Sequence, residues 1–503
     1  MPRRGKAKSS DMSNGADADR TATLLMTSGG DARILLSPEN GLNRYFSAPR
    51  PSRTLAYASS TANDISAAAF AHVEAKLEEL APSGELSAQD YARQLELMRG
   101  RIRRAYEVPA DVAIVFAPSG TDLEYVALAC TAGRAARGTH NILLGADEVG
   151  SGCIYSAYGQ YFAESTALGV PTKAGDPVPG LGETHVEMID IPVRDSSGHA
   201  RPSPVIRAAL GEAIGHAIAD GRHPLIHVVH GSKTGLILPS LADLDRLRRE
   251  HGAGISFVVD ACQARITSSA IADYLKRDAI LFITGSKFMG APPFSGFALV
   301  PPRLAKSARP LPAGFATIFG QGEWPSEWPG AETLPAIANP GLMLRLEAAL
   351  FELERFQALA LEDVTRVILA FHQAVRSEIV DPTEARRVAP YPPGEKETAE
   401  THPIEMRTLS MLDLSRLGGG SWSFEDAQRL HKDLLEHGIR LGQPVKCVKL
   451  ADGRCGATLR IGLTMWQVVE RAGLAGRQLQ SSFDADMGRI AGALEKIARP
   501  PLQ

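Results

Sequence analysis

Long apolar runs, an excess of one charge and a secretory signal are all missing from this sequence of 503 residues. No hydrophobic segment approaches the roughly 20 residues that span a bilayer. The N-terminal stretch MPRRGKAKSSD is basic but has no apolar core, which excludes a secretory signal. Because 54 basic and 57 acidic residues nearly cancel, no overall field attracts nucleic acid or an anionic membrane. We therefore expect partners of neither kind.

Cysteine is scarce as well, and this shortage bears on the redox compartment and on metals. The five cysteines form no CxxC pair and no Cys/His spacing that is typical of a metal site. We therefore expect no disulfide framework, no metal and a cytoplasmic location, where thiols stay reduced. The composition that remains, 44% hydrophobic and 22% charged, is that of an ordinary soluble globular protein.

The order of segments predicts a leader, an arm and two domains. The leader is polar and aperiodic, which predicts disorder, and the arm is rich in turn signals. Strands then alternate with helices, which predicts an α/β fold with a mostly parallel sheet covered by helices on both faces. A smaller α/β domain is expected to follow. The expected boundaries are 1–31 for the leader, 32–64 for the arm, 65–341 for the large domain, 342–361 for a bridging helix and 362–503 for the small C-terminal domain.

One lysine stands out because it lies between two apolar runs. Residues 279–283 and 296–300 predict buried strands, and the polar, glycine-rich segment between them predicts a turn that contains Lys287. A lysine held against apolar structure loses solvation, which lowers the pKa of its amine and makes it a usable imine-forming nucleophile. A lone lysine in a loop is more often a solvated charge, so this assignment depends on the neighbouring motifs.

An acid lies at a matching position upstream. The segment GISFVVD, residues 254–260, predicts another buried strand, and it ends in Asp260. An acid at the carboxyl end of a parallel strand lies where open α/β sheets bind ligands. Asp260 precedes Lys287 by 27 residues, which leaves room for one helix and one more strand.

Two further motifs indicate anion binding. The strand at 111–116 is followed by Ser119, Gly120 and Thr121 and then by a helix, an arrangement that presents free backbone N–H groups to a phosphate. Near the C-terminus, Arg460 lies within an apolar strand pattern. A charge on a buried strand has to be paired, and the guanidinium fork matches a carboxylate.

Taken in chain order, these motifs resemble those of fold-type I pyridoxal-phosphate enzymes of the class V aminotransferase and cysteine desulfurase superfamily. The resemblance implies pyridoxal 5′-phosphate as cofactor, held by Lys287 as a Schiff base. It implies that Asp260 pairs with the pyridinium nitrogen and that Arg460 holds the α-carboxylate of the substrate. The full set of cofactor-binding residues that it implies is Ser119, Gly120, Thr121, Ser232, Asp260, Gln263, Ser286, Lys287 and Thr333.

Two stretches depart from the superfamily pattern. Ser232 and Lys233 stand where relatives have Asn-Glu, although Ser232 could still bond the 3′ oxygen of the cofactor. Glu148 or Val149 falls where relatives carry an aromatic or histidine residue stacked on the ring. The stacking residue is therefore left open, and the missing histidine argues against a straightforward desulfurase.

The resemblance also implies contacts from a partner subunit and from the arm. Thr333, in the segment GAETLP, matches a threonine that contacts the cofactor phosphate of the other subunit, so a homodimer with shared active sites is implied. In relatives an N-terminal arm crosses toward the active site. Asn43, Arg44 or Tyr45 could therefore touch substrate, and we take Asn43 as the candidate. The alternatives are a packed surface loop for Thr333 and a surface arm for Asn43.

Which bond at the α-carbon breaks is left open at this point. Aminotransfer needs only a proton moved by Lys287, whereas a desulfurase also needs a thiol shortly before the carboxylate-binding arginine. Cys447, 13 residues before Arg460, is a possible nucleophile of this kind. We expect an aminotransferase that acts on a small amino-acid substrate. The alternatives are a cysteine desulfurase-like C–S lyase, decarboxylation or aldol-type chemistry, and a non-catalytic protein with the same fold.

Overall fold

A mixed sheet forms the centre of the large domain. The computed structural model describes residues 21–80, 85–146, 148–149, 152–181 and 186–498. The strands of this sheet are β2 (Ala113–Ala117), β3 (Thr139–Leu144), β4 (Val186–Ile191), β5 (His223–His230), β6 (Ile237–Leu238), β7 (Ser256–Asp260), β8 (Ala279–Thr284) and β9 (Gly296–Val300). Their spatial order is β2-β9-β8-β7-β5-β3-β4, and β6 pairs with β5. Strand β9 is antiparallel to both of its neighbours and β6 to β5, whereas the other pairs are parallel.

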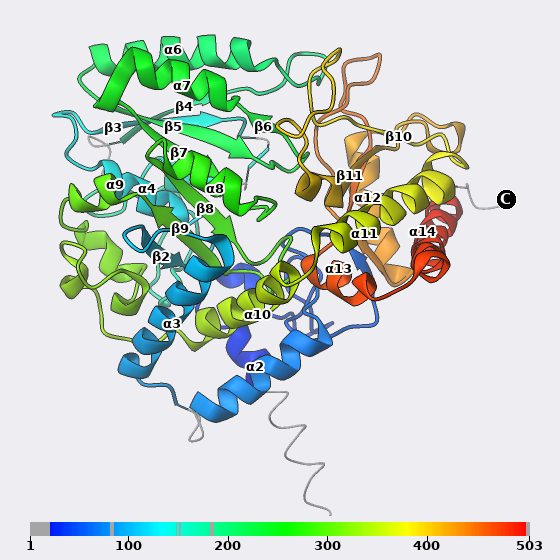
Figure 1. Cartoon of the computed structure of the whole chain (residues 1–503), viewed down its shortest axis with the longest axis horizontal. Coiled ribbons are helices and arrows are strands. Elements are labelled where there is room, and N and C mark those ends of the chain that lie inside the picture. Colours follow the sequence, from blue (N-terminus) through cyan, green and yellow to red (C-terminus); the bar gives the residue numbers. More distant parts are fainter. Residues whose placement is uncertain (1–20, 81–84, 147, 150–151, 182–185, 499–503) are drawn as a thin grey trace, which may run out of the picture.

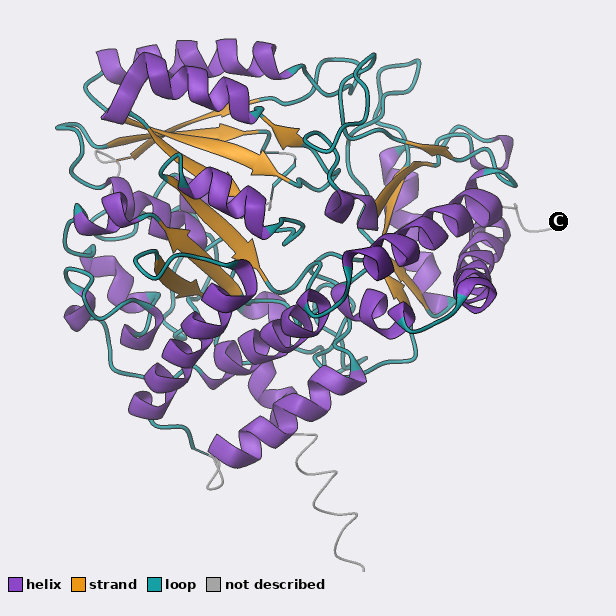
Figure 2. Ribbon diagram, in the orientation of Figure 1, coloured by secondary structure: helices purple, strands orange, loops and turns teal. Residues whose placement is uncertain are grey.

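Alternate side chains of β2, β7, β8 and β9 pack into two separate cores, one on each face of the sheet. Phe257 and Val259 of β7 pack into one core, and Val258 between them packs into the other. Because both faces are buried, continuous apolar runs are needed, and every residue of β5 and β8 is buried. Helices lie above and below the sheet (Figure 2). The expected α/β fold, with a mostly parallel sheet covered on both faces, is thus confirmed.

The helices of the large domain differ in length and position. Residues of α2, α3, α6, α7 and α10 pack into the core on one face of the sheet, and residues of α4 and α9 pack into the core on the other face. In Figure 1, α6 and α7 lie toward the β4 end of the sheet and α3 lies toward the β2 end. The bounds are α2 (Ala67–Leu80), α3 (Ala88–Tyr106), α4 (Leu123–Thr131), α5 (Cys153–Ala157), α6 (Ser203–Ala219), α7 (Leu241–His251), α8 (Ser268–Leu275), α9 (Pro302–Lys306) and α10 (Pro340–Gln357). Helix α10 occupies most of the expected bridging helix.

The C-terminal domain has its own core and lies to one side of the large sheet, yellow to red in Figure 1. Its antiparallel sheet has the order β10-β11-β13. A second small sheet pairs β1 in parallel with β12, and Tyr57 of β1 packs into the core of this domain. The N-terminal arm is therefore tied to the small domain. The elements are β1 (Leu55–Tyr57), β10 (Arg386–Arg387), β11 (Leu409–Asp413), β12 (Ile439–Leu441), β13 (Thr458–Gly462), α11 (Leu361–Ala374), α12 (Phe424–Glu436), α13 (Met465–Ala472) and α14 (Gly476–Ala498).

The expectation of a disordered leader up to residue 31 is wrong for residues 21–31. Residues 21–26 are helical, and Ala22 and Met26, one helical turn apart, are buried in the core of the large domain. Two apolar side chains on one helical face are enough to hold the segment against that core. The rest of the expected leader, residues 1–20, lies outside the described residues.

One strand of the small domain is shorter than its apolar pattern suggests. The pattern of residues 404–412 predicts a strand over its whole length, but Ile404–Thr408 form a 3₁₀ helix and β11 begins at Leu409. The hydroxyl of Thr408 donates to the carbonyl of Glu405, and this local bond favours a turn over an extended chain. Among the described residues, we find no helix that is both long and apolar enough to cross a membrane.

Candidate active site

A cavity of about 230 Å³ lies where the parallel strands end, between the two domains. Strand β7 ends at Asp260, and the turn after β8 contributes Lys287. Ser232 follows β5, and Thr121 lies between β2 and α4. Arg460 reaches the same cavity from β13 of the small domain. The motifs that the sequence spreads over 340 positions therefore share one site.

The turn that carries Lys287 is fixed from two sides. The side-chain amide of Asn63, from the N-terminal arm, donates to the carbonyls of Ser286 and Lys287, at 3.1 and 2.5 Å. On the other side, a Cβ at Gly285 would lie only 2.4 Å from the Cβ of Ala349 in α10, so only glycine allows this close packing. The lysine side chain thus starts from a rigid backbone at the edge of the cavity.

Asp260 and Gln263 are both oriented by neighbouring donors. The N–H of Cys262 donates to Oδ1 of Asp260 at 2.9 Å. Nη1 of Arg265 donates to Oε1 of Gln263 at 3.0 Å. Because arginine can only donate, this contact identifies the amide oxygen and leaves the Nε2 donor of Gln263 for the cavity. Burial, together with Arg460, lowers the pKa of Arg265 to about 9.

The turn formed by Ser119, Gly120 and Thr121 has unused donors. A Cβ at Gly120 would lie 3.1 Å from Cγ2 of Thr284 and 3.2 Å from Sγ of Cys262, so glycine lets the turn approach the ends of β7 and β8. In the part of the chain that the structure describes, the N–H groups of Gly120 and Thr121 and the hydroxyl of Thr121 donate to no protein acceptor. Free N–H groups at the start of a helix favour an anion.

Arg460 is a buried cation without an acid beside it. Its side chain is 3% exposed, and Nε donates to the carbonyl of Gln443 at 3.1 Å while Nη1 lies 3.4 Å from the carbonyl of Lys233. No carboxylate among the described residues lies within 4 Å of its guanidinium nitrogens. Burial lowers the pKa of Arg460 to about 10, against the attraction of Glu148. The planar fork of such a guanidinium matches the two oxygens of a carboxylate.

Glu148, by contrast, is fully used by its neighbours. It accepts from Nε of Arg194 at 2.7 Å, from the hydroxyl of Ser232 at 2.7 Å and from the hydroxyl of Thr234 at 2.9 Å. Ser232 lines the cavity, but its hydroxyl donates to Glu148, so it offers a ligand only an acceptor. Val149 also lines the cavity and is the apolar side chain at the expected stacking position.

Three predicted site residues do not line the cavity. Asn43 accepts from the N–H of Tyr45 and from Ser47, so its amide oxygen shapes the arm, and it is Tyr45 that lines the cavity. Thr333 lies on the surface in a 3₁₀ turn, and its hydroxyl donates to the carbonyl of Gly330 at 2.7 Å. Cys447 is buried in a small apolar cluster, and burial raises the pKa of its thiol to about 12. A thiol that stays protonated at neutral pH is a poor nucleophile.

Several lining residues were not predicted. Arg33 pairs with Asp31 and lies over the ring of Phe294, 4.8 Å from its centroid. Its place in the sequence, next to a presumed leader, gave no signal. Cys262 lies inside the motif from Asp260 to Gln263, so position alone could have identified it. The other unpredicted lining residues are Ser60, Thr61, Glu124, Cys153, Gly231, Phe282, Thr284, Ser295 and Gln443.

Comparison with known proteins finds no match in sequence and clear matches in structure. No family model and no curated protein matches the chain. The ureidoglycine–glyoxylate aminotransferase of Bacillus subtilis matches with a TM-score of 0.52 at 12% identity, over 87% of this chain and 98% of that one. The cysteine desulfurase CsdA of Escherichia coli has a TM-score of 0.53 at 15% identity, over 88% and 95%.

A third structure has a ligand in its description. It is a variant of C-DES with glycine covalently linked to its PLP cofactor, and it matches with a TM-score of 0.54 at 14% identity, over 87% of this chain and 97% of that one. At such identities the likeness extends to the fold alone. Across both domains, the chain therefore has the fold of class V aminotransferases and cysteine desulfurases, that of fold-type I pyridoxal-phosphate enzymes.

Proposed function

We propose that this protein is a pyridoxal-phosphate-dependent aminotransferase that acts on a small amino-acid substrate. The observation that carries the proposal is the position of Arg460. This buried guanidinium, with no carboxylate beside it among the described residues, lines the same cavity as the amine of Lys287. A carboxylate held by Arg460 would place the neighbouring α-carbon of an amino acid toward Lys287.

The described residues fit the cofactor at both of its ends. The free N–H groups of Gly120 and Thr121 suit a phosphate, and glycine at position 120 lets this turn lie close to the ends of β7 and β8. The Asp260 carboxylate, oriented by the N–H of Cys262, suits a protonated ring nitrogen. The Nε2 donor of Gln263 suits the ring oxygen. The C-DES structure, which holds a PLP cofactor in the same fold, supports this assignment.

Each residue then has a definite task. Bound pyridoxal phosphate supplies a ring that accepts the electrons released when a bond at the α-carbon breaks. Lys287 would attach the cofactor and, once displaced by substrate, carry a proton at the α-carbon. Asp260 would keep the ring nitrogen protonated. Arg460 would bind the carboxylate and so select which α-bond is aligned for cleavage.

The thiols favour aminotransfer over sulfur chemistry. A desulfurase needs a thiolate that reaches the substrate sulfur. Cys447 does not line the cavity, and its pKa is raised by burial. Cys153 and Cys262 do line it, but burial raises the pKa of both thiols as well. Aminotransfer requires no thiol, since Lys287 alone can move the proton.

A homodimer with shared active sites is part of the proposal. Thr333 is exposed at the surface, which suits a contact with the cofactor phosphate of a partner subunit. The molar mass in solution, measured by light scattering with and without cofactor, tests this part. A monomer that binds the cofactor as tightly as any dimer would contradict it.

A single turnover of cofactor-loaded protein with a panel of L-amino acids, cysteine included, tests the reaction. Mass spectrometry should find pyridoxamine phosphate and an oxo acid, and the reactive amino acid names the donor. Sulfide and alanine with the cofactor left in its aldehyde form would instead establish the C–S lyase. Carbon dioxide or an aldehyde would indicate decarboxylation or aldol-type cleavage. Protein that never binds the cofactor would contradict the proposal in all these forms.

A further inference from the structure

A buried carboxyl group lies directly behind the turn proposed for the cofactor phosphate. Asp122 is 6% exposed, and its Oδ2 lies 2.5 Å from Oγ of Ser119. The N–H of Asp122 also donates to the same hydroxyl oxygen, at 3.3 Å. Among the described residues, the Ser119 hydroxyl therefore forms its hydrogen bonds with Asp122.

Whether the hydroxyl of Ser119 can donate to a phosphate depends on the protonation state of Asp122. A serine hydroxyl has one proton. An ionised Asp122 can only accept, so it holds that proton and leaves the phosphate facing lone pairs. A protonated Asp122 can donate to Oγ of Ser119, which releases the serine proton for a phosphate oxygen. The proton on Asp122 thus decides whether Ser119 is a donor to an anion.

The charged groups nearest to Asp122 do not stabilise its ionised form strongly. Asp31, the residue before the 3₁₀ helix Ala32–Ile34, adds a like charge. Arg33 could offset it, but two of its three nitrogens donate to Asp31, Nε to Oδ1 at 2.8 Å and Nη2 to Oδ2 at 2.6 Å. Burial, helped by Asp31, raises the pKa of Asp122 to about 7, while the bond from Ser119 and the charge of Arg33 oppose the rise.

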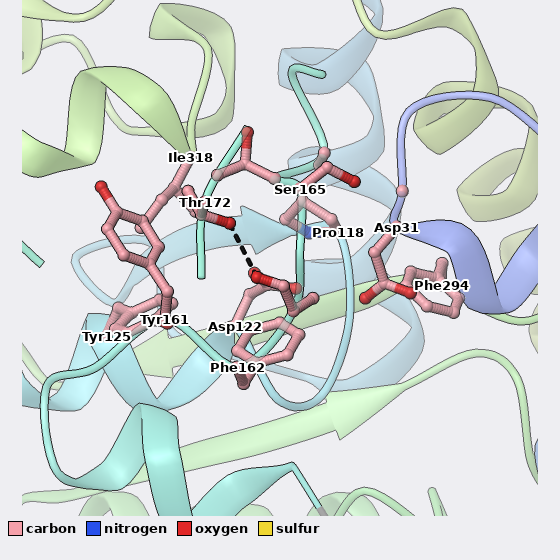
Figure 3. Close-up of a pocket in the computed structure, with 14 residues that line it drawn as sticks. Asp31, Pro118, Asp122, Tyr125, Tyr161, Phe162, Ser165, Thr172, Phe294 and Ile318 are labelled. Carbon is pink, nitrogen blue, oxygen red and sulfur yellow. Dashed lines mark hydrogen bonds between the residues drawn. The ribbon is translucent and has the colours of Figure 1, made fainter. Parts of the chain in front are cut away.

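The other groups packed around Asp122 add no positive charge. Tyr125 and Tyr161 line a small cavity with Asp31 and Asp122, and Figure 3 shows all four side chains. The volume of this cavity, about 10 Å³, leaves room for about one water, by which a proton can reach the carboxyl group. Burial raises the pKa of Tyr125, and it raises that of Glu323, also near Asp122, to about 8. Of these described groups, Arg33 is the one cation.

We propose that Asp122 is a positioning residue that takes up one proton from water when a phosphate group binds at Ser119–Thr121. The neutral carboxyl group then donates to Oγ of Ser119, and the Ser119 hydroxyl turns its own proton to the phosphate. No other bond changes. The inference rests on the proposed function, because the phosphate is taken to be that of the cofactor.

This coupling makes phosphate affinity depend on pH with a definite sign. A bound phosphate adds negative charge beside Asp122 and raises its pKa above the value in the free protein. Binding is then fully supported below about pH 7 and weakens as pH rises, by up to about tenfold per pH unit until the pKa of the bound state is reached.

Calorimetry on the full-length apoprotein tests the proposal. Pyridoxamine 5′-phosphate and pyridoxamine are titrated in turn at about pH 8, where the ligand phosphate is already a dianion. Each titration is repeated in two buffers of different ionisation enthalpy, which counts the protons taken up. Because pyridoxamine lacks the phosphate, its titration gives the number of protons taken up when the ring alone binds. We expect about one additional proton for the phosphorylated ligand. An equal count for the two ligands would overturn the proposal without any variant.

Asp122→Asn identifies the group that takes up the proton. Its amide donates to Oγ of Ser119 at every pH, so the additional proton should disappear and the affinity should become nearly independent of pH between 7 and about 8.5. Glu323→Gln is the matched control, because it removes another buried carboxyl group of raised pKa that does not bond Ser119. It should keep the additional proton. Unchanged proton uptake in Asp122→Asn would overturn the proposal.

The same titrations separate the two proposals. Apoprotein that binds neither pyridoxal phosphate nor pyridoxamine 5′-phosphate overturns the proposed function and this inference together. Apoprotein that binds both ligands, with no proton beyond the count for pyridoxamine, overturns only the role of Asp122.

Discussion

Two sets of residues at the same cavity differ in how their polar groups are used. In the binding set, Arg460 has no carboxylate beside it among the described residues, and the N–H groups of Gly120 and Thr121 donate to no described protein acceptor. In the supporting set, Glu148 accepts hydrogen bonds from Arg194, Ser232 and Thr234. Unsatisfied buried groups cost free energy, so they are retained where a ligand completes them. We therefore expect the binding set to bind a ligand and the supporting set to stabilise the fold.

The departures from the expected motif pattern fall in the supporting set. Glu148 and Ser232, at which the sequence departs from that pattern, bond each other at 2.7 Å. Variants of the supporting set should therefore lose stability, whereas variants of the binding set should lose function.

The largest effect is expected from Lys287→Ala. The variant should lose the cofactor colour and about 10⁴-fold or more in turnover, because both attachment and proton transfer depend on this amine. Absorbance and single-turnover mass spectrometry measure the two effects. Lys233→Met, which changes another lysine of the cavity, should keep the colour. Equal loss of colour in both variants would remove the special role of Lys287.

Glu148→Ala should disrupt the supporting set. It leaves Arg194, whose side chain is only 12% exposed, without its acidic partner, which costs up to about 3–5 kcal/mol. Thermal unfolding should show a clear fall in melting temperature for the apoprotein. An unchanged melting temperature together with lost cofactor binding would mean that Glu148 belongs to the binding set, and the comparison would fail.

Arg460→Met should have the opposite profile. Losing the carboxylate fork should raise the KM for the amino acid about 100-fold, equivalent to about 2.7 kcal/mol. Cofactor binding should remain. The melting temperature should change little, since a guanidinium whose pKa is lowered by burial gives little to the folded state. Kinetics of the half-reaction and calorimetry supply the two values. A large fall in the melting temperature with an unchanged KM would contradict the assignment of Arg460 to substrate binding.

Thr121→Val should weaken the phosphate site moderately. The variant keeps the shape of the side chain and removes one donor, so the dissociation constant of pyridoxamine 5′-phosphate should rise about 5- to 10-fold. Pyridoxamine, which lacks the phosphate, should bind the variant and the natural protein equally. Equal weakening for both ligands would show that Thr121 contacts the ring instead.

Cys447→Ser should have the smallest effect. The thiol is buried outside the cavity lining, so the aminotransfer rate should stay within about twofold of the natural value. If sulfide production from cysteine is observed and disappears in this variant, the lyase alternative replaces the aminotransferase.

The local pattern was sufficient for the strands and for the order of the motifs. Strands β7 and β8 are mainly apolar runs, so the sequence alone locates them within two residues. It also places Asp260 at the end of β7 and Lys287 in the turn after β8. The interval between the motifs follows from the length of one helix and one strand. The leader and the strand at 404–412 were misjudged, because Met26 and Thr408 make contacts that composition and periodicity do not show.

What the sequence by itself determined is the α/β fold and the residue types available at the strand ends, because hydrophobic periodicity and turn chemistry act over a few residues. The use of each polar side chain was decided only by the tertiary structure. The amide of Asn63 reaches the Lys287 turn across 224 positions, and Ser232 finds Glu148 across 84. Hydrogen bonds between distant segments exist only once the chain is packed, and they decide which donors are left for a ligand.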